Sequence, residues 1–561
     1  MASSDSKTAS PRSSIQKGGD ALFYESTPPL GVAVDAPRGL FDLRPKVDLD
    51  AIATQPSVFD DPQTLEAYRP PPEYENSHRF DSNARWTWRE EQRIVRKIDL
   101  RVMVWAFIMF FCLDLDRTNI STANTNNFLG DLGMNTNDYN LGNTLFRASF
   151  LIAELPSQLV SKRVGPDVWI PSQIALWSIV SFSQFWLSGR SSFLATRCLL
   201  GFMQGGFIPD VVLYLSYYYT KNELPIRLAW FWISNYLSHI VGTLIGTAIL
   251  QLDGVHGRAG WRYVYLIEGC LTAAVGVASF FMMPPGPTQT RAWFRPNGWF
   301  DEREEVIMVN RVLRDDPTKS SMHNRQGLSV HAIVKSVLDW RLWPLYALGI
   351  THMIPSGPPQ VYLTLSLRNL GFNTTQSSLL SIPAYVVGGL GLVGTAYLSE
   401  AINSRTLATV ICQIWTLPLL ITLYTFNSST SEWVYYAVVT LVVGFPYVHP
   451  IQVAWASRNS YSVRTRTVSA SVYNMFVQAG AIIYANIYRN DDKPLYKRGN
   501  RDLIAINCMN IVLYAFTFFF YRILNKRRDK KWDAMTPEER AQYHELSKDE
   551  GNQRLDFRFA Y

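Results

Sequence analysis

The sequence has few of the features that mark disulfide-linked, metal-binding or secreted proteins. Its 561 residues include five cysteines, and no two of them form a CxxC pair. All five lie within apolar stretches, so neither a disulfide framework nor a zinc site is expected. They are Cys112, Cys198, Cys270, Cys412 and Cys508. The first residues, Met1 to Lys17, lack the apolar core of a cleaved signal peptide.

Sequence motifs of enzymes are missing as well. We find no phosphate-binding glycine loop, no metal-ligand spacing and no nucleophile elbow, so the sequence predicts no enzymatic activity, metal or cofactor. The net charge is +7, and the basic residues cluster beside apolar stretches. This placement favours orientation in a membrane over binding of nucleic acid.

Long apolar stretches are what the sequence does have. They are about 20 residues long, which is the length a helix needs to cross a bilayer. The 17 Trp and 28 Tyr suit the two membrane interfaces. We therefore predict an all-α membrane protein with twelve transmembrane helices. The spans are placed near 99–118, 141–161, 168–188, 192–219, 226–250, 262–284, 341–366, 376–399, 405–426, 432–456, 465–487 and 502–524.

A polar stretch between the sixth and seventh spans divides the helices into two bundles of six, as in transporters built from repeats around a central site. Residues 1–95 form an N-terminal tail, predicted to be largely disordered. The further units are a first bundle (96–284), a central loop (285–340), a second bundle (341–524) and a C-terminal tail (525–561).

The orientation follows from the tails and the central loop. All three share one side of the membrane and all are basic, which places them in the cytoplasm. Three glycosylation sequons, at Asn119, Asn373 and Asn427, then fall at or near outside loops. Asn119 is too close to the membrane to be modified, so Asn373 and Asn427 are the predicted glycosylation sites.

Charged residues within spans are costly and mark a cavity, a relay or a structural pair. Arg117, Arg147 and Arg197 are expected at similar depth, in the outer halves of the first, second and fourth spans. Together with Asp114 and Glu154 they predict a cationic, partly neutralised cavity. The planar fork of arginine suits carboxylate, sulfate or phosphate.

A second interpretation of these charges is structural. Asp116–Arg117 and Glu154–Arg197 would then be pairs that lock helices together, with no role in transport. Both interpretations remain open at this point.

The seventh span contains IPSGPPQVY, which cannot form a regular helix because proline removes a donor and clashes with the preceding turn. Broken helices at membrane depth usually line a cavity. His352 and Gln360 flank this break and are candidate substrate ligands. His352 is either a proton carrier or a hydrogen-bonded packing residue.

The sequence resembles the major facilitator superfamily, and within it the fungal allantoate permease branch of anion:cation symporters. The resemblance begins near Arg96 and rests on the order and spacing of several motifs. These are LDRTNIS, AELPSQLVSKRVGP, RCLLGFMQGGFIP, WRYVYLIEG, WASRN, DDKPLYKRG and LDFRFAY. The resemblance implies two six-helix bundles that rock about a central site, and proton-coupled uptake of a small anion.

The resemblance also suggests roles for single residues. Arg117 and Arg197 stand where vesicular glutamate transporters and sialin have arginines linked to substrate and coupling. Gln204 stands where that group usually has a glutamate, and a glutamine cannot carry a proton. Coupling would then fall to Glu154, Asp114 or His352, or be absent. In the loop motif after the second span, Lys162 replaces an acidic residue, whereas its counterpart GTAYLSEAINSR keeps Glu400 and Arg405.

Together these observations predict a proton-coupled secondary transporter that imports a small organic or inorganic anion by alternating access. Arg117, Arg147, Arg197, Gln204, His352 and Gln360 would bind the substrate, and Asp114 and Glu154 would carry the proton. It would act as a monomer in the plasma membrane. An exporter of a secondary metabolite is the nearest alternative, and a non-transporting nutrient receptor is an alternative from another class.

Overall fold

The computed structural model describes residues 30–31, 48–124, 126–220, 223–321, 334, 337–402, 404–427, 429–460, 466–492, 495–536, 539–540, 542–543 and 551–561. Within these ranges the regular elements are helices, and β-pairing is limited to two isolated bridges. The all-α prediction is therefore confirmed. Residues 1–29 and 32–47, for which we predicted disorder, lie outside the described residues. The same is true of most of segment 322–336 in the predicted central loop.

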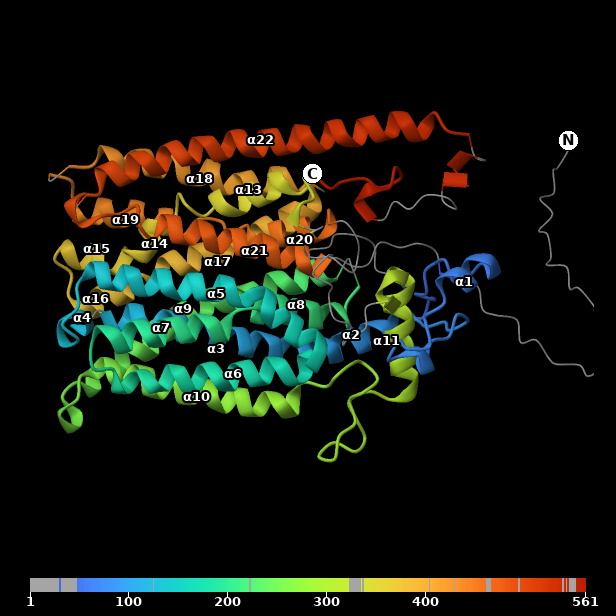
Figure 1. Cartoon of the computed structure of the whole chain (residues 1–561), viewed down its shortest axis with the longest axis horizontal. Coiled ribbons are helices and arrows are strands. Elements are labelled where there is room, and N and C mark those ends of the chain that lie inside the picture. Colours follow the sequence, from blue (N-terminus) through green and yellow to red (C-terminus); the bar gives the residue numbers. More distant parts are fainter. Residues whose placement is uncertain are drawn as a thin grey trace, which may run out of the picture.

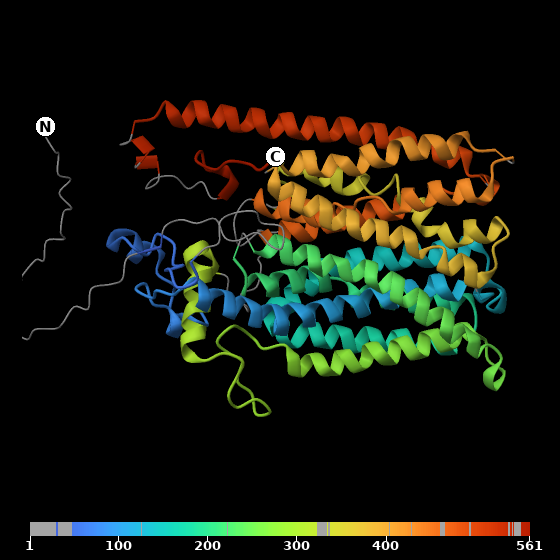
Figure 2. The ribbon, with the colours of Figure 1, turned by 180° about the vertical axis from the view of Figure 1, so that it is seen from behind.

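The first half of the chain forms a bundle of helices that run along the long axis of the molecule (Figures 1 and 2). A short helix, α4 (Phe128–Asp131), lies between α3 and α5. The other elements of this bundle are η3 (Asp99–Met103), α3 (Val104–Asn124), α5 (Thr136–Val164), α6 (Pro166–Ser183), α7 (Arg190–Gln204), α8 (Phe207–Ser216), α9 (Leu224–Ile249) and α10 (Gly260–Met282).

The second half forms another bundle beside the first, coloured yellow to red in Figure 1. Its elements are α13 (Trp343–Thr351), α14 (Gly357–Val361), α15 (Leu363–Asn369), α16 (Thr374–Leu379), α17 (Ile382–Ala401), α18 (Arg405–Thr425), α19 (Glu432–Val443), α20 (His449–Arg458), α21 (Arg466–Tyr484) and α22 (Lys497–Asp533). We call the end of the molecule at the α15–α16 turn the outer end, and the opposite end, near α11 (Glu302–Asp315), the inner end.

Six helical stretches in the described part of the chain are long and apolar enough to cross a membrane. The charged helices α3 and α5 are not among them. Every predicted span nevertheless coincides with one helix or with a series of shorter ones. The number of twelve spans stays a prediction.

Four predicted spans are interrupted, including the eighth, where α16 ends at Leu379 and α17 begins at Ile382. The break expected in the seventh is confirmed, since α13 ends at Thr351 and α14 begins at Gly357. The fourth, predicted to be continuous, bends between α7 and α8, where Gly206 has a φ of 85° that favours glycine. The tenth, also predicted to be continuous, stops at Val443 and resumes at His449. The intervening Pro446 cannot donate a helical hydrogen bond, which explains that break.

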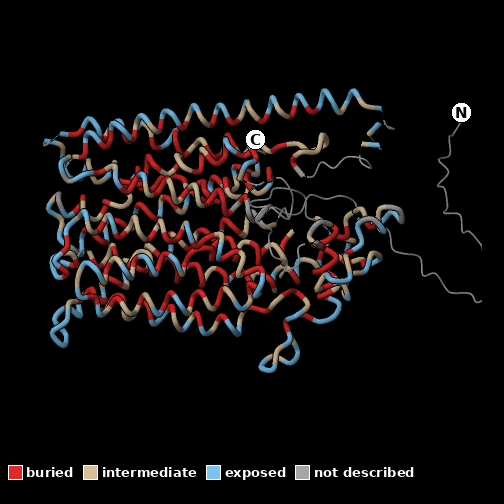
Figure 3. The backbone as a smooth tube through the Cα atoms, viewed as in Figure 1, coloured by how far each residue is buried: buried red, intermediate tan, exposed pale blue. Residues whose placement is uncertain are grey.

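The outward faces of the bundle are apolar and exposed. Leu390 is 70% exposed and Val512 69%. Figure 3 shows exposed residues all along α22, the outermost helix of the second half. Exposed apolar surface of this extent is typical of helices that face lipid.

Residues 48–95, predicted to belong to a disordered tail, are folded at the inner end. They include α1 (Pro62–Tyr68), η2 (Ser77–Arg79) and α2 (Trp88–Ile98). Phe59 packs against Val309 and Leu313 of α11. This contact is the physical reason for the correction, because α11 supplies an apolar face that the tail's own composition does not reveal.

Candidate functional site

Close packing of α5 against α7 brings the predicted arginines together. A side chain at Gly201 would collide with the carbonyl oxygen of Phe146, and one at Gly205 would lie 2.8 Å from that of Phe150. Small residues at such positions let two helix backbones approach. Gly201 and Gly205 therefore allow α5 and α7 to pack closely.

Arg117 lies on α3, and its side chain contacts α7 and α5. Its Nε donates to Oε1 of Gln204 on α7 over 2.9 Å. Its guanidinium lies over the ring of Phe150 on α5, 5.0 Å from the ring centre. The nearest carboxylate is that of Asp114, one turn earlier, at 3.6 Å.

Arg197 on α7 is 2% exposed. One terminal nitrogen donates to Oδ1 of Asn143 on α5 over 3.1 Å, and the guanidinium lies 4.6 Å from the ring centre of Phe146. Its Nε and its other terminal nitrogen have no hydrogen-bond partner. Buried donors without partners are rare, so these two nitrogens are available to an anion.

Arg147 on α5 faces the second half of the molecule. It donates to Oε1 of Gln478 on α21 over 3.0 Å and lies over the ring of Tyr484. Arg117, Arg147 and Arg197 are close enough to repel one another electrostatically. The structure therefore brings the three predicted arginines into one cluster.

The two predicted proton carriers lie beside this cluster. Oδ2 of Asp114 accepts from Asn235 of α9 over 2.9 Å. Oε1 of Glu154 accepts from Asn474 of α21 over 2.8 Å, whereas its Oε2 is buried without a partner. A carboxyl group with one free oxygen has room for a proton on that oxygen.

The structure does not form the alternative structural pairs, Asp116–Arg117 and Glu154–Arg197. Asp116 accepts hydrogen bonds from Trp177 at 3.1 Å and Ser181 at 2.6 Å, both on α6, so it is a packing residue within the first half. Glu154 bonds Asn474 and Arg197 bonds Asn143. The sequence suggested such pairs because it indicates the depth of a side chain in the membrane but not which neighbouring helix that side chain faces.

His352 is placed at the end of α13, in the second half. Its Nδ1 lies 3.0 Å from the carbonyl oxygen of Leu348, and its Nε2 is buried without a partner. Its ring lies parallel to that of His449, with centres 6.2 Å apart. Gln360 lies on α14, and among the described residues it makes no side-chain hydrogen bond to the arginines. Neither residue belongs to the arginine cluster.

Sequence reasoning missed four polar residues of the site, Asn143, Asn235, Asn474 and Gln478. A signal for their surroundings was present, since Asn140, Arg147 and Glu154 are seven residues apart on α5. Seven residues are about two helical turns, so the three lie on one face. That face contacts the second half of the molecule.

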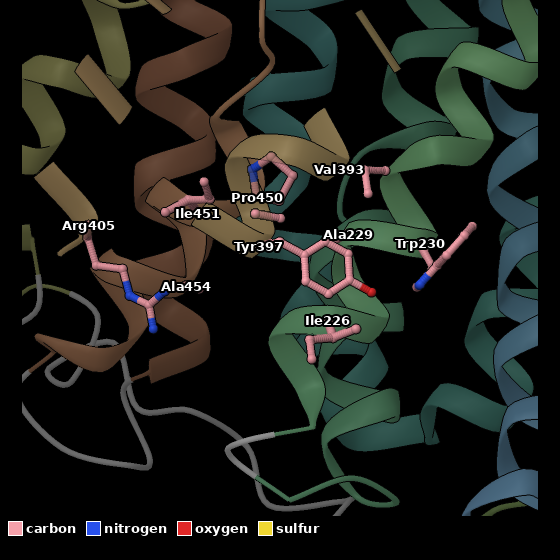
Figure 4. Close-up of a pocket in the computed structure, with 10 residues that line it drawn as sticks. Ile226, Ala229, Trp230, Val393, Tyr397, Arg405, Pro450, Ile451 and Ala454 are labelled. Atoms are coloured by element: carbon pink, nitrogen blue, oxygen red, sulfur yellow. The ribbon is translucent and has the colours of Figure 1, made fainter. Parts of the chain in front are cut away.

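A separate groove lies between the halves near the inner end, and its lining includes none of Arg117, Arg147 and Arg197. Its walls are largely apolar and come from α9 in the first half and α17, α18 and α20 in the second (Figure 4). Trp230 and Tyr397 face it from opposite halves, with Arg405 at one side. Its apolar lining does not suit a small anion.

The sequon asparagines differ in accessibility. Asn373 is exposed and caps α16 at the outer end, and Asn427 is exposed after α18. Asn119 is 1% exposed within α3, which agrees with its exclusion as a glycosylation site. Modification of Asn373 and Asn427 stays a prediction.

Two helical bundles with apolar outer faces and a polar, arginine-containing seam between them define a multi-pass membrane transporter. Residues 106–485 match the family model of the Major Facilitator Superfamily. The chain belongs to this superfamily, as its sequence motifs suggested.

The most similar relatives compared are fungal. The chain is 46% identical over 519 residues to an uncharacterized transporter of Saccharomyces cerevisiae, covering 92% of this chain and 95% of the relative. It is 26% identical to the MFS-type transporter cnsO of Penicillium expansum, covering 78% of this chain and 85% of that one.

A solved structure supports the fold alone. A bacterial homologue of the human lysosomal transporter Spinster, in an inward-facing and occupied conformation, matches with a TM-score of 0.51 and 15% identity. The match covers 75% of this chain and 96% of that one. The major facilitator fold is therefore confirmed.

Proposed function

We propose that the protein is a secondary active transporter that imports a small organic or inorganic anion, together with protons, by alternating access. The observation that carries this proposal is the cluster of Arg117, Arg147 and Arg197. Arg147 and Arg197 donate to neutral amides, of Gln478 and Asn143, so their charges are not cancelled by these partners. An anion bound among them would supply the missing negative charge and accept the free donors of Arg197.

Glu154 is the favoured proton carrier, with Asp114 as the second candidate. Gln204 accepts from Arg117 and has no ionisable group, so it cannot replace either carboxylate. Glu154 is buried, touches the second half through Asn474 and retains a free oxygen. These features suit a group that binds a proton and senses the position of the other half.

The sequence motifs also suggest a branch of the superfamily for this protein. We place the chain in the allantoate permease branch of anion:cation symporters and in the plasma membrane, where it acts as a monomer. Its tails would face the cytoplasm, and Asn373 and Asn427 would carry glycans outside. His352 and Gln360 would contact substrate only if the halves move, because neither lies in the arginine cluster.

Uptake assays test the proposal. A null strain that expresses the protein is grown on single sulfur and nitrogen sources to find the anion that supports growth. Uptake of that anion, here called the supporting anion, is then measured with and without a protonophore. Uptake should rise at acidic external pH and collapse with the protonophore. In the Glu154→Gln variant, the pH response should be lost. Anion uptake that is insensitive to both treatments would rule out proton coupling.

Two assays separate the rival functions. Net efflux of a metabolite from preloaded vesicles, without uptake, would favour the exporter. For the receptor, a deletion must spare the folded residues 48–95, so removal of residues 1–47 is the appropriate variant. Loss of a signal with intact transport in that variant would favour a receptor role.

A further inference from the structure

Where α5 meets the second half, the seam contains polar residues spaced at seven-residue intervals along α5, while α9 packs against α17 elsewhere in the seam. Three of them bond the second half. Asn140 accepts from the hydroxyl of Tyr362 over 3.1 Å, at the outer end. Arg147 donates to Gln478 over 3.0 Å. Glu154 accepts from Asn474 over 2.8 Å, furthest from the outer end. We call these contacts the outer, middle and inner rungs.

Each rung depends on a different chemical state. The outer rung joins two neutral groups. The middle rung joins a guanidinium to an amide oxygen, which takes one of the positions that an oxygen of an anion would take. The inner rung joins an amide N–H to a carboxyl group, and this bond is stronger when the carboxyl is ionised. Charged groups that interact with Glu154 are Arg117 from α3 and Asp210 from α8.

We infer that Gln478 and Asn474 are positioning residues that latch the two halves until an anion and a proton arrive. An anion at Arg147 displaces the oxygen of Gln478 and releases the middle rung. A proton on Glu154 weakens the bond from Asn474 and loosens the inner rung. Both events act on the same seam, so binding is translated into separation of α5 from α21. The inference rests on the proposed function for the identity of the two ligands.

The placement of the rungs supports this coupling. Gln478 and Asn474 are four residues apart on α21, so both lie on the face that α21 presents to α5. Asn474 is 5% exposed, which means that water does not compete for its amide. The outer rung responds to neither ligand and serves as an internal comparison.

The latch is tested without any substrate, on the purified full chain. Spin labels are attached at Asn137 and Asn486, which are exposed at the outer ends of α5 and α21. Exposed Cys198, Cys270 and Cys508 are first replaced by alanine. Distances between the labels are measured by pulsed electron paramagnetic resonance at pH 7.5 and at pH 5.5.

At pH 7.5 the Gln478→Ala and Asn474→Ala variants should each raise the population with separated outer ends by about two- to tenfold, as expected for loss of one hydrogen bond. Acidification should raise that population in the parent chain and in Gln478→Ala, but not in Asn474→Ala. Tyr362→Phe is the matched control. It removes a rung, yet the response to acid should remain.

Distance distributions of Gln478→Ala and Asn474→Ala that equal the parent's at both pH values would overturn the latch. So would an acid response that survives unchanged in Asn474→Ala. Neither result bears on the proposed function, which depends on uptake. Conversely, the protein could fail to take up an anion while the distance between the spin labels still changes with pH. That result would contradict the proposed function but not the latch.

Discussion

At the residue scale, the shape of the cationic side chains matters as much as their charge. Arg197 uses one terminal nitrogen for Asn143 and keeps two nitrogens free, while its planar group lies over Phe146. A lysine has a compact charge and cannot bond and stack in this way. The proposed anion site therefore depends on the planar shape of the guanidinium groups as well as on their positive charge.

We expect Arg197→Lys to lower kcat/KM for uptake of the supporting anion about ten- to a hundredfold, since a charge-assisted hydrogen bond is worth about 1.5–3 kcal/mol. The measurement is initial uptake at several substrate concentrations, corrected for the amount of protein in the membrane. Arg190→Lys is the control on the same helix, because Arg190 pairs with Asp138 near the surface. Equal uptake by the two variants would contradict the assigned role of Arg197.

At the element scale, the approach of α5 to α7 positions two of the three arginines. We expect Gly201→Val to push these helices apart, at a cost of about 1–3 kcal/mol, and to abolish uptake. The control is Gly394→Val on α17, where an added side chain meets nothing within 4 Å. Thermal unfolding of both purified variants, followed by tryptophan fluorescence, is the measurement. An unchanged midpoint for Gly201→Val would show that the packing tolerates separation.

A second element-scale feature is Arg311, one of the buried cations of α11. Arg311 is 4% exposed and bonds Glu223 over 2.7 Å, the carbonyl of Tyr218 over 2.8 Å and, more weakly, Glu91. Burial alone would raise the pKa of Glu223, but the charge of Arg311 and a backbone N–H lower it overall. The folded tail, α11 and the start of α9 are thus held by one ion-pair network.

The sign of that pKa shift leads to a pH prediction. A carboxyl group with a depressed pKa stabilises the fold above its unfolded value, 4.5, and loses this contribution as pH falls below it. Stability due to the pair should therefore be constant from about pH 8 to about pH 5. Arg311→Met should cost about 3–5 kcal/mol across this range, because it removes the buried cation that bonds Glu223.

Unfolding midpoints of Arg311→Met and Arg303→Met provide the comparison for this network. Arg303 lies on the same helix, and its pair with Glu90 is exposed. Removing an exposed pair should cost no more than about 1 kcal/mol. If the unfolding midpoint falls by the same amount in both variants, burial of Arg311 contributes nothing to the strength of the network.

At the scale of the whole molecule, each half is held at its inner end by an additional folded segment, which we call a clasp. The first half is held by residues 48–98 and α11. The second is held by residues 551–561, where Asn525 exchanges two hydrogen bonds with Phe559 and the carbonyl of Ala560 accepts from Trp455 and Asn459. These hydrogen bonds of the C-terminal segment all lie within the second half, so the proposed separation of the halves would not break them.

Deleting residues 551–561 should lower the unfolding midpoint by several degrees, since each lost hydrogen bond is worth about 1 kcal/mol and such a loss shifts the midpoint by about 2–4 °C. Differential scanning fluorimetry of the purified protein measures this. Arg558→Ala is the control, because it removes a partly exposed pair with Asp529 and two hydrogen bonds to carbonyls of the same segment, but none of the bonds that Phe559 and Ala560 make to the second half. A deletion variant as stable as the parent would show that the clasp does not hold the second half.

The sequence determined the fold class, the break in the seventh span and the depth of the three arginines. These follow from apolar length, proline chemistry and helix direction, which are local properties of the chain. It also determined the spacing of Asn140, Arg147 and Glu154 on one face of α5. Their partners could not be derived in this way, because Tyr362 and Gln478 are more than two hundred residues distant.

Only the tertiary structure decided which polar groups meet. It separated His352 from the arginines, assigned Asp116 to packing against α6, and joined Glu154 to Asn474 across the seam. It also folded residues 48–95 onto α11, whose apolar face they need. The physical reason is common to all these cases. A helix's sequence indicates how deep a side chain lies, but the neighbour it faces depends on how separate helices pack.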